Sequence, residues 1–183
     1  MPSNVPMHGR GKPTPRDILR ITVGRSQDWR FPKTADREAE DTPGKLICPT
    51  CHAISVEKRW FLDEALYQRL RSEPDVTAVV CPGCARVERG IFEGRVLIGG
   101  NWLREHKDEI LSLVKNEEEK ARQTNPFSRV GVTKEQGEEI ELFLTTQWLA
   151  ERIGKELHKA YKGQLRIDHL PGEKFSWVWW SRD

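Results

Sequence analysis

The chain contains four cysteines, and they occur as two short pairs of the form Cys-Pro-x-Cys. Cys48 and Cys51 form the first pair, Cys81 and Cys84 form the second, and 29 residues separate the two pairs. A Cys-x-x-Cys turn brings two thiolates within reach of one cation, and two such turns supply the four soft ligands of a tetrahedral zinc site. The spacing therefore predicts one zinc ion, held by Cys48, Cys51, Cys81 and Cys84.

We expect this zinc to be structural rather than catalytic. Four thiolates fill the coordination shell, whereas a hydrolytic zinc needs an open position for water. His52 directly follows the first pair, but we expect it to be an exposed neighbour of the site and not a ligand. The metal is therefore predicted to hold together the fold of a zinc ribbon.

Three other uses of the cysteines are weighed against zinc. Two disulfides would need an oxidising compartment, and residues 1–20 contain no apolar stretch of the kind found in a secretory signal. A dithiol redox centre needs only one pair, and neither pair is expected to open a helix after a strand. An iron–sulfur cluster is the third alternative, because it also takes four thiolates.

The composition describes a hydrophilic chain of one or two small domains. Of its 183 residues 37% are hydrophobic, and the mean hydropathy is −0.67. No stretch approaches the roughly 20 apolar residues of a membrane span. The net charge of +2 is the difference between 30 basic and 28 acidic residues, so the placement of the charges matters more than their sum. We expect a soluble, cytoplasmic protein with no membrane partner and no small-molecule substrate.

Residues 1–44 are rich in proline and sustain no helical period, so we expect a disordered arm. Between residues 10 and 33, seven basic residues stand against two acidic ones, with aromatic residues among them. This mixture suits a tail that neutralises phosphates and stacks on unpaired bases, although an ordinary solvated tail is an equal alternative. The RNA-binding residues predicted in the arm are Arg10, Lys12, Arg16, Arg20, Arg25, Trp29, Arg30 and Lys33.

Residues 45–98 are predicted to form the zinc-ribbon domain. Short strands should lead into both cysteine turns and return from them, with residues 86–88 completing the second hairpin. An apolar pattern of helical spacing between the two pairs ends before Pro74 and predicts an inserted helix. Basic and aromatic residues follow each hairpin, where they either contact RNA or simply solubilise a small domain. These RNA-binding candidates are Lys58, Arg59, Trp60, Arg86 and Arg89.

Residues 91–100 are predicted to form a strand and a turn, and residues 99–125 a linking helix. Asn101 is the expected N-cap, and an apolar stripe continues to about Lys115, with His106 as a packed core histidine. The polar second half should continue the helix as a solvated connector up to Asn125, which precedes a proline.

Residues 126–183 are predicted to form a ββαββ domain with a four-stranded antiparallel sheet, so that the fold class is α+β. Two strands at 127–134 and 140–146 precede an amphipathic helix at 147–162, which Gly163 closes. Two further strands follow at 164–170 and 174–180. The last strand holds three tryptophans in four residues, and we expect burial of both its faces rather than an aromatic platform for stacking.

The chain resembles a family of small bacterial zinc-ribbon proteins with a C-terminal α+β domain, which are often encoded among stress or low-oxygen genes. The matching stretches run from about residue 44 to residue 180. They are Gly44–Leu46 before the first cysteine pair, Lys58–Trp60, the second pair, Glu105–Leu111, Asn116–Glu119, Arg152–Gly154 and Ala160–Gly163.

That family is similar, more distantly, to the N-terminal zinc-binding part of the adaptor for export of the large ribosomal subunit, also called nonsense-mediated decay protein three. The adaptor binds the large subunit near its tRNA sites and has more paired-cysteine turns, so at most one of its zinc sites corresponds to this one. His52 and Ala85 stand where a glycine often follows such turns.

The resemblance implies a ribosomal or RNA target and names no catalytic residue. We therefore expect a non-enzymatic RNA-binding protein that associates with the ribosome, at the large subunit or its tRNA sites, as a stress or hibernation factor. The alternative is a protein-interaction or DNA-binding regulatory module that uses the ribbon as a docking surface. An enzyme is disfavoured, because the sequence has no nucleophile–base grouping, phosphate-binding loop or open metal site.

Overall fold

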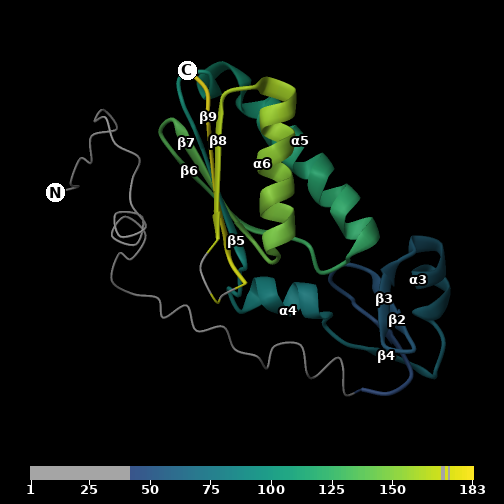
Figure 1. Ribbon diagram of the computed structural model, residues 1–183. Coiled ribbons are helices and arrows are strands. Elements are labelled where there is room, and N and C mark those ends of the chain that lie inside the picture. The colour runs from purple at the N-terminus through teal and green to yellow at the C-terminus, as the bar shows by residue number, and fades with distance from the viewer. Residues whose placement is uncertain (1–41, 170–171, 173) are drawn as a thin grey trace. The chain divides into compact units, whose positions relative to one another are not determined.

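The computed structural model describes residues 42–169, 172 and 174–183. The arm expected over residues 1–44 lies outside the described residues, except for its last three positions. In the described part the chain folds into four helices and two β-sheets, which is the expected α+β class (Figure 1). None of these helices combines the length and the apolar character that a membrane span requires.

The first sheet carries the first cysteine pair. It contains β1 (Lys45–Ile47), β2 (Ala53–Val56), β3 (Arg59–Leu62) and β4 (Val76–Ala78), in the order β3-β2-β1-β4. β1 and β2 form the expected antiparallel hairpin, whereas β4 pairs parallel to β1. Parallel strands need a crossover connection, and helix α3 (Glu64–Leu70) lies within it.

Helix α3 is the helix predicted between the cysteine pairs. The Asp63 carboxylate accepts a hydrogen bond from the Leu66 N–H at 2.9 Å and so caps the helix. One face of the helix packs on the sheet and makes a core too small to stabilise an independent domain. The buried residues of this core are Ile47, Ile54, Tyr67 and Leu70.

The second cysteine pair opens a helix, and the hairpin predicted to end at residues 86–88 is wrong. Pro82–Glu88 form helix α4, with Cys81 as its N-cap. Pro82 occupies the first helical turn, where its missing N–H leaves no hydrogen bond unmade. The prediction failed because a helix of seven residues is too short to show a helical period in the sequence.

The second sheet has five strands and is mixed, so the predicted four-stranded antiparallel sheet is wrong. Its order is β6-β7-β5-β9-β8. The central strand β5 (Gly94–Gly99) is antiparallel to β7 (Glu139–Leu144) and parallel to β9 (Ser176–Ser181). A strand was expected over residues 91–100, but parallel pairing joins segments far apart in the chain and leaves no local signal of the partner.

The two hairpins predicted in the C-terminal part are confirmed. β6 (Val130–Gln136) pairs antiparallel with β7, and β8 (Gln164–His169) pairs antiparallel with β9. Each hairpin contributes one inner strand and one edge strand to the sheet. β5 lies between the hairpins and joins them into one sheet.

Helices α5 (Leu103–Thr124) and α6 (Gln147–Tyr161) cover the same face of this sheet (Figure 1). The predicted apolar stripe of α6 is buried against the sheet, and Gly154 lets the helix approach Val178 closely, since a Cβ there would lie 2.4 Å from the valine side chain. The large core beneath the helices includes Val96, Ile98, Ile110, Val114, Ile140, Leu142, Leu144, Leu149, Ile153, Leu157, Val178 and Trp180.

Helix α5 differs from its prediction in two respects. Its N-cap is Trp102, which makes no side-chain capping hydrogen bond, and the N–H of the expected cap Asn101 donates to the Asp183 carboxylate at 3.3 Å. Its second half is no solvated connector, since Glu117 and Ala121 are buried. His106 lies on the predicted stripe but is half-buried, with its ring stacked on Trp102 at a centroid distance of 3.8 Å.

Glu117 on α5 accepts two ionic hydrogen bonds, one from its own helix and one from Arg152 of α6, which joins the two helices. Its side chain is 5% exposed and accepts from Lys120 Nζ at 2.7 Å and from Arg152 Nε at 2.6 Å. Burial by itself raises the pKa of this carboxyl, but the two cations outweigh burial and hold the pKa below its ordinary value of 4.5. Glu117 is therefore ionised in the folded protein.

We predict that Glu117→Gln lowers the free energy of unfolding at pH 7 by about 1.5–3 kcal/mol, the usual contribution of hydrogen bonds to a charged group. Since the folded pKa lies below 4.5, the contribution is complete above that ordinary value and is lost as the pH falls through the folded value. Urea unfolding at pH 7 and at stepwise lower pH measures both effects. The exposed Glu119→Gln is the control, and equal losses in the two variants at pH 7 would contradict the prediction.

Candidate metal centre and aromatic sheet face

The four cysteine side chains converge on one point, as the spacing predicted. Cys48 follows β1, Cys51 lies in the turn before β2, Cys81 caps α4 and Cys84 lies in its first turn. Their sulfur atoms all lie within 4.8 Å of one another. Four sulfurs bound to one zinc at about 2.3 Å stand about 3.8 Å apart. The arrangement therefore fits a tetrahedral metal site.

Backbone N–H groups point at the sulfur atoms. The Cys81 N–H donates to Cys48 Sγ at 3.3 Å, and the Cys84 N–H donates to Cys81 Sγ at 3.5 Å. Such N–H donors stabilise negative charge on sulfur. They are what a set of metal-bound thiolates requires from its surroundings.

His52 is a neighbour of the site and does not belong to its ligand set. Its Nδ1 lies 2.8 Å from a carboxylate oxygen of Glu64, and its ring stacks on Tyr67 at 4.0 Å. Its φ of 63° closes the turn, with its N–H donating to the Cys48 carbonyl at 2.9 Å. The expectation that His52 lies beside the first cysteine pair is confirmed.

The crowded sulfur atoms affect one another's ionisation. Hydrogen bonding from the other cysteines lowers the pKa of Cys48. For Cys51, Cys48 raises the pKa, but Cys81 and Cys84 outweigh it and lower the pKa to about 6. The same interactions raise the pKa of Cys81 and Cys84. By themselves the four thiols share their protons, and a divalent cation among them is what allows all four to ionise.

Arg129 is a residue of this site that the sequence analysis missed. It precedes β6, is 7% exposed and lies close enough to the sulfurs of Cys51, Cys84 and Cys81 to interact with them electrostatically. Burial lowers the pKa of an arginine, but the negative sulfurs of Cys51, Cys84 and Cys81 outweigh it and raise the pKa of Arg129. An isolated basic residue before a strand shows no pattern in the sequence, so only the fold reveals its neighbours.

Helix α4 bears on the redox alternative. A cysteine at a helix N-terminus often has a reactive thiolate, and Cys81 holds that position although no helix was expected there. Its sulfur, however, lies 3.5 Å from the sulfur of Cys51, which belongs to the other pair. The pairs form a single cluster of four, and this favours a metal with a filled shell over an isolated dithiol.

The basic and aromatic candidates of the ribbon do not form one patch. Lys58 and Arg59 are exposed at the turn between β2 and β3, and Arg89 is exposed as the C-cap of α4. Trp60 is half-buried, packs on the cysteines and meets the Phe127 ring edge-on at 6.5 Å. The candidates of the arm, from Arg10 to Lys33, lie outside the described residues.

Arg86, another RNA-binding candidate, is partly buried and contacts other residues of the protein. Its Nη1 lies 3.0 Å from a carboxylate oxygen of Glu93 and 3.2 Å from the Thr145 carbonyl oxygen. These contacts connect α4 to the five-stranded sheet.

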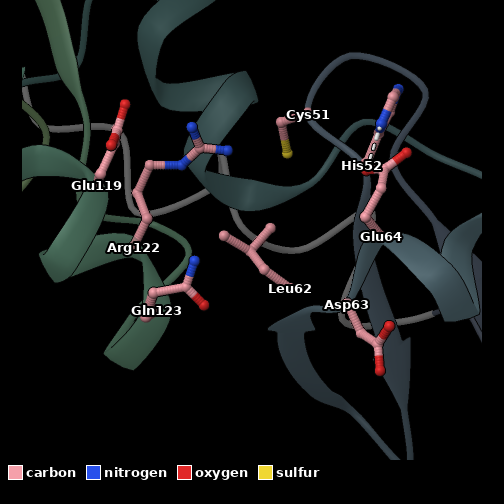
Figure 2. A pocket seen from close by; sticks show the side chains of 8 residues that line it. All are labelled: Cys51, His52, Leu62, Asp63, Glu64, Glu119, Arg122 and Gln123. Carbon is pink, nitrogen blue, oxygen red and sulfur yellow. Dashed lines mark hydrogen bonds and ion pairs between the residues drawn. The ribbon is translucent and has the colours of Figure 1, made fainter.

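A cavity of about 410 Å³ borders the cysteine cluster (Figure 2). Side chains of the ribbon and of the end of α5 face each other across it, and Cys51 is the metal-site residue that reaches it. Arg122 contributes a positive group, against three carboxylates of the lining. Because both charges are present and His52 is already paired with Glu64, no class of ligand is favoured. The remaining lining residues are Leu62, Asp63, Glu119 and Gln123.

The sheet face opposite α5 and α6 carries aromatic side chains. Along β9, Val178 and Trp180 point under the helices, so Trp177 and Trp179 lie on the other face, where the described part of the chain places no helix (Figure 1). The rings of Trp177 and Trp179 stack at 6.0 Å with an interplanar angle of 14°. Both are half-buried, so the expected burial of β9 is complete on one face and partial on the other.

Cationic side chains extend this stack across the whole sheet. The Arg166 guanidinium lies 5.4 Å from the Trp179 ring centroid, and Arg95 lies 5.0 Å from that of Trp177. Arg95 and Lys134 also lie over Phe143, at 5.8 Å and 5.0 Å. The six residues come from all five strands. We call them the cation–aromatic row: Arg166, Trp179, Trp177, Arg95, Phe143 and Lys134.

Carboxylates balance most of the charge of the row. Arg95 forms an ion pair with Glu141, and Arg166 forms one with Asp168 at 2.5 Å. These pairs hold the guanidinium groups in place over the rings. The row therefore has little net charge, and the half-buried Trp177 and Trp179 are its accessible rings, whereas Phe143 is buried.

A comparison with models of known protein families gives no match for this sequence, and a comparison with curated proteins gives none either.

We predict that the purified protein contains one metal ion per chain and that a strong chelator unfolds the ribbon. Metal binding supplies about 10–16 kcal/mol in small zinc domains, which the core of α3 cannot replace. Elemental analysis gives the metal content, and amide hydrogen exchange should show residues 45–88 losing protection after chelation. Cys81→Ser should reproduce this loss without chelator. Unchanged amide hydrogen exchange and an unchanged melting temperature in the chelated protein would contradict a structural role for the metal.

The turn between β2 and β3 allows stability and binding to be tested separately. Glu57 and Lys58 both have positive φ, 51° and 64°, in a two-residue turn that strongly prefers Asn-Gly. We predict that the double change Glu57→Asn and Lys58→Gly stabilises the ribbon by about 1 kcal/mol. Thermal melting measures this gain, and Lys58→Gln is the control that removes the charge but keeps the backbone requirement. If Lys58 contacts RNA, both variants lose affinity equally.

Proposed function

We propose that this protein is a non-enzymatic zinc-ribbon protein that binds single-stranded RNA and associates with the ribosome. The observation that carries the proposal is the cation–aromatic row on the sheet face that α5 and α6 leave uncovered. Zinc is the proposed metal, because four thiolates in tetrahedral reach are its usual structural ligand set.

The row has the chemistry of a surface on which bases stack. Every base has a π-face, so stacking on aromatic rings binds single strands with little preference for sequence, at about 1–3 kcal/mol per base. Arginine guanidinium planes stack on bases in the same way. The two tryptophans and their flanking arginines offer a continuous surface for two or more successive bases.

Phosphate contacts must come from elsewhere, because Glu141 and Asp168 neutralise two of the three cations of the row. The basic arm is the proposed source, through its residues 10–33, together with Lys58 and Arg59 of the ribbon. On this proposal the row holds bases while the arm neutralises phosphates and makes the affinity depend on salt.

The ribosome is the proposed RNA target because of the resemblance to the bacterial zinc-ribbon family and to the large-subunit export adaptor. We place the proposed site on the large subunit or across its tRNA sites, in the cytoplasm. A factor bound there during stress would keep tRNA or mRNA out, which is a hibernation role.

One observation favours the alternative of a protein-interaction module. Trp148 is 46% exposed on α6, with the Arg152 guanidinium 5.3 Å from its ring centroid. Exposed tryptophan beside arginine is the composition of an interaction hot spot. A partner protein docked there would bind in the absence of RNA.

We predict that Trp179→Ala weakens the binding of a short single-stranded RNA by about 1–3 kcal/mol, the contribution of one stacked base. Trp179→Phe should retain most of the affinity, because it keeps an aromatic face. Fluorescence anisotropy with a labelled oligonucleotide measures binding, and circular dichroism checks the fold. Trp148→Ala, which removes a tryptophan from the helix layer, is the matched control. Equal affinity of Trp179→Ala and Trp148→Ala would contradict RNA binding on the row.

Co-sedimentation with purified ribosomes across a salt series tests the cellular target. The intact chain should pellet in stoichiometric amounts at low salt, and a chain without residues 1–33 should pellet less. Pelleting that resists both high salt and removal of the arm would refute the role proposed for the arm. Capture of a protein partner that survives RNase and depends on Trp148 would instead support the interaction module.

A further inference from the structure

Arg129 is held rigidly against the metal centre by the end of β7. Its backbone N–H donates to Thr145 Oγ1 at 2.8 Å, and its carbonyl accepts from the Thr145 N–H at 3.0 Å. The Thr145 hydroxyl also donates to the Phe127 carbonyl at 2.6 Å. The arginine therefore cannot leave the site without breaking the attachment of its strand.

The guanidinium of Arg129 is a buried cation without a carboxylate partner in the described part of the chain. Its Nε and Nη2 are both buried and donate to no hydrogen-bond acceptor there. A buried charge is costly unless an opposite charge compensates it. The groups beside it belong to the cysteine cluster, because its Nε lies 3.5 Å from the position of a Cβ at Gly83, next to Cys84, and the sulfurs of Cys51, Cys84 and Cys81 act on it electrostatically.

Arg86 shows what a conventional partner looks like at the same contact. It also connects α4 to the sheet, but it does so through the Glu93 carboxylate and the Thr145 carbonyl. The two arginines thus sit on the same interface with different counter-charges. Arg129 interacts with sulfur atoms, whereas Arg86 interacts with oxygen atoms.

The chain is packed closely around this contact. A Cβ at Gly83, between Pro82 and Cys84, would lie 2.9 Å from the Phe127 Cα and 3.5 Å from Arg129 Nε. No side chain fits at that position, so the guanidinium reaches the first turn of α4 directly. The ribbon and the sheet meet with the metal centre and Arg129 between them.

We propose that Arg129 is the outer counter-cation of the metal centre and makes the contact between ribbon and sheet depend on the metal. Four thiolates around a divalent metal carry a net charge of about −2, and the guanidinium offsets part of it. With metal bound, the sheet residue and the ribbon attract each other. Without metal, the four sulfurs are no longer held together around one ion, Arg129 remains buried without a fixed counter-charge, and the contact opens. This inference stands independently of RNA binding.

The proposal makes Arg129 a positioning residue for the metal, acting on the ligands and not on the ion. Outer-shell partners of metal ligands typically change metal affinity by about 10–100-fold. We expect Arg129→Met, which keeps an unbranched apolar stem and removes the charge, to lower zinc affinity in that range. Competition with a chromogenic chelator on the full chain measures it.

Arg86→Met is the matched control, because it removes an arginine from the same interface without removing charge beside sulfur. Its zinc affinity should stay within about 2-fold of the unaltered chain, against the 10–100-fold loss expected of an outer-shell partner. An equal loss of zinc affinity in Arg86→Met and Arg129→Met would overturn the proposal, since the effect would then come from the interface and not from the charge.

Cobalt replacing zinc gives a second readout that a merely structural role would not change. A cation beside thiolates lowers the energy of the sulfur electrons, so its removal should shift the sulfur-to-cobalt charge-transfer band to longer wavelength. Arg129→Lys, which keeps the charge but loses the fork of donors, should shift the band less than Arg129→Met. If Arg129→Met does not fold, Arg129→Gln, which also removes the charge but stays polar, replaces it, and an unshifted band with unaltered zinc affinity in that variant overturns the proposal.

The opening of the contact is tested by limited proteolysis of the holo and chelated protein. Cleavage should increase on metal removal in residues 89–93, which connect α4 to β5, and in residues 125–128, which lie between α5 and β6 and contact the ribbon at Gly83. In Arg129→Met these segments should already be cleaved with zinc bound. Cleavage that does not respond to metal in the unaltered chain would overturn the metal dependence of the contact.

Discussion

The repulsion among four sulfur atoms within 4.8 Å of one another is the constraint on which this structure depends. They cannot all carry charge unless cations lie among them or beside them. The fold meets this requirement with backbone N–H groups that donate to the sulfurs of Cys48 and Cys81, with the buried Arg129 and with room for one metal ion. The ribbon has little apolar core of its own, so the electrostatics of this cluster determine whether its strands remain assembled.

The five-stranded sheet divides its two faces between stability and recognition. Helices α5 and α6 bury one face almost completely, down to Trp180 at 1% exposure. The other face carries the cation–aromatic row, in which ion pairs hold arginines over tryptophan rings. A rigid strand positions these groups more accurately than a loop would, because each side chain is fixed by its neighbours on adjacent strands.

The sequence predicts local features well and nonlocal ones poorly. Each cysteine pair, the stripe of α6 and both C-terminal hairpins were evident, since each is a pattern within a short stretch of chain. Helix α4 was not predicted, because it extends only about one turn beyond the cysteine pair that opens it and is too short to show a helical period. The pairing of β5 and the neighbours of Arg129 depend on segments more than 40 residues apart, for which one sequence contains no signal.

The central position of β5 also has a consequence for how the chain reaches its fold. β5 pairs on one side with β9, about 80 residues further along the chain. The backbone edge of this strand, which contains the apolar Val96 and Ile98, therefore has no partner on that side while the intervening chain is being made. Contacts of such long range form slowly. A nascent chain that has reached only α6 exposes a half-built sheet, and such an edge recruits strands of other molecules. The sheet can thus be completed only when β9 has been synthesised, and the incomplete chain is the form of this protein most prone to aggregation.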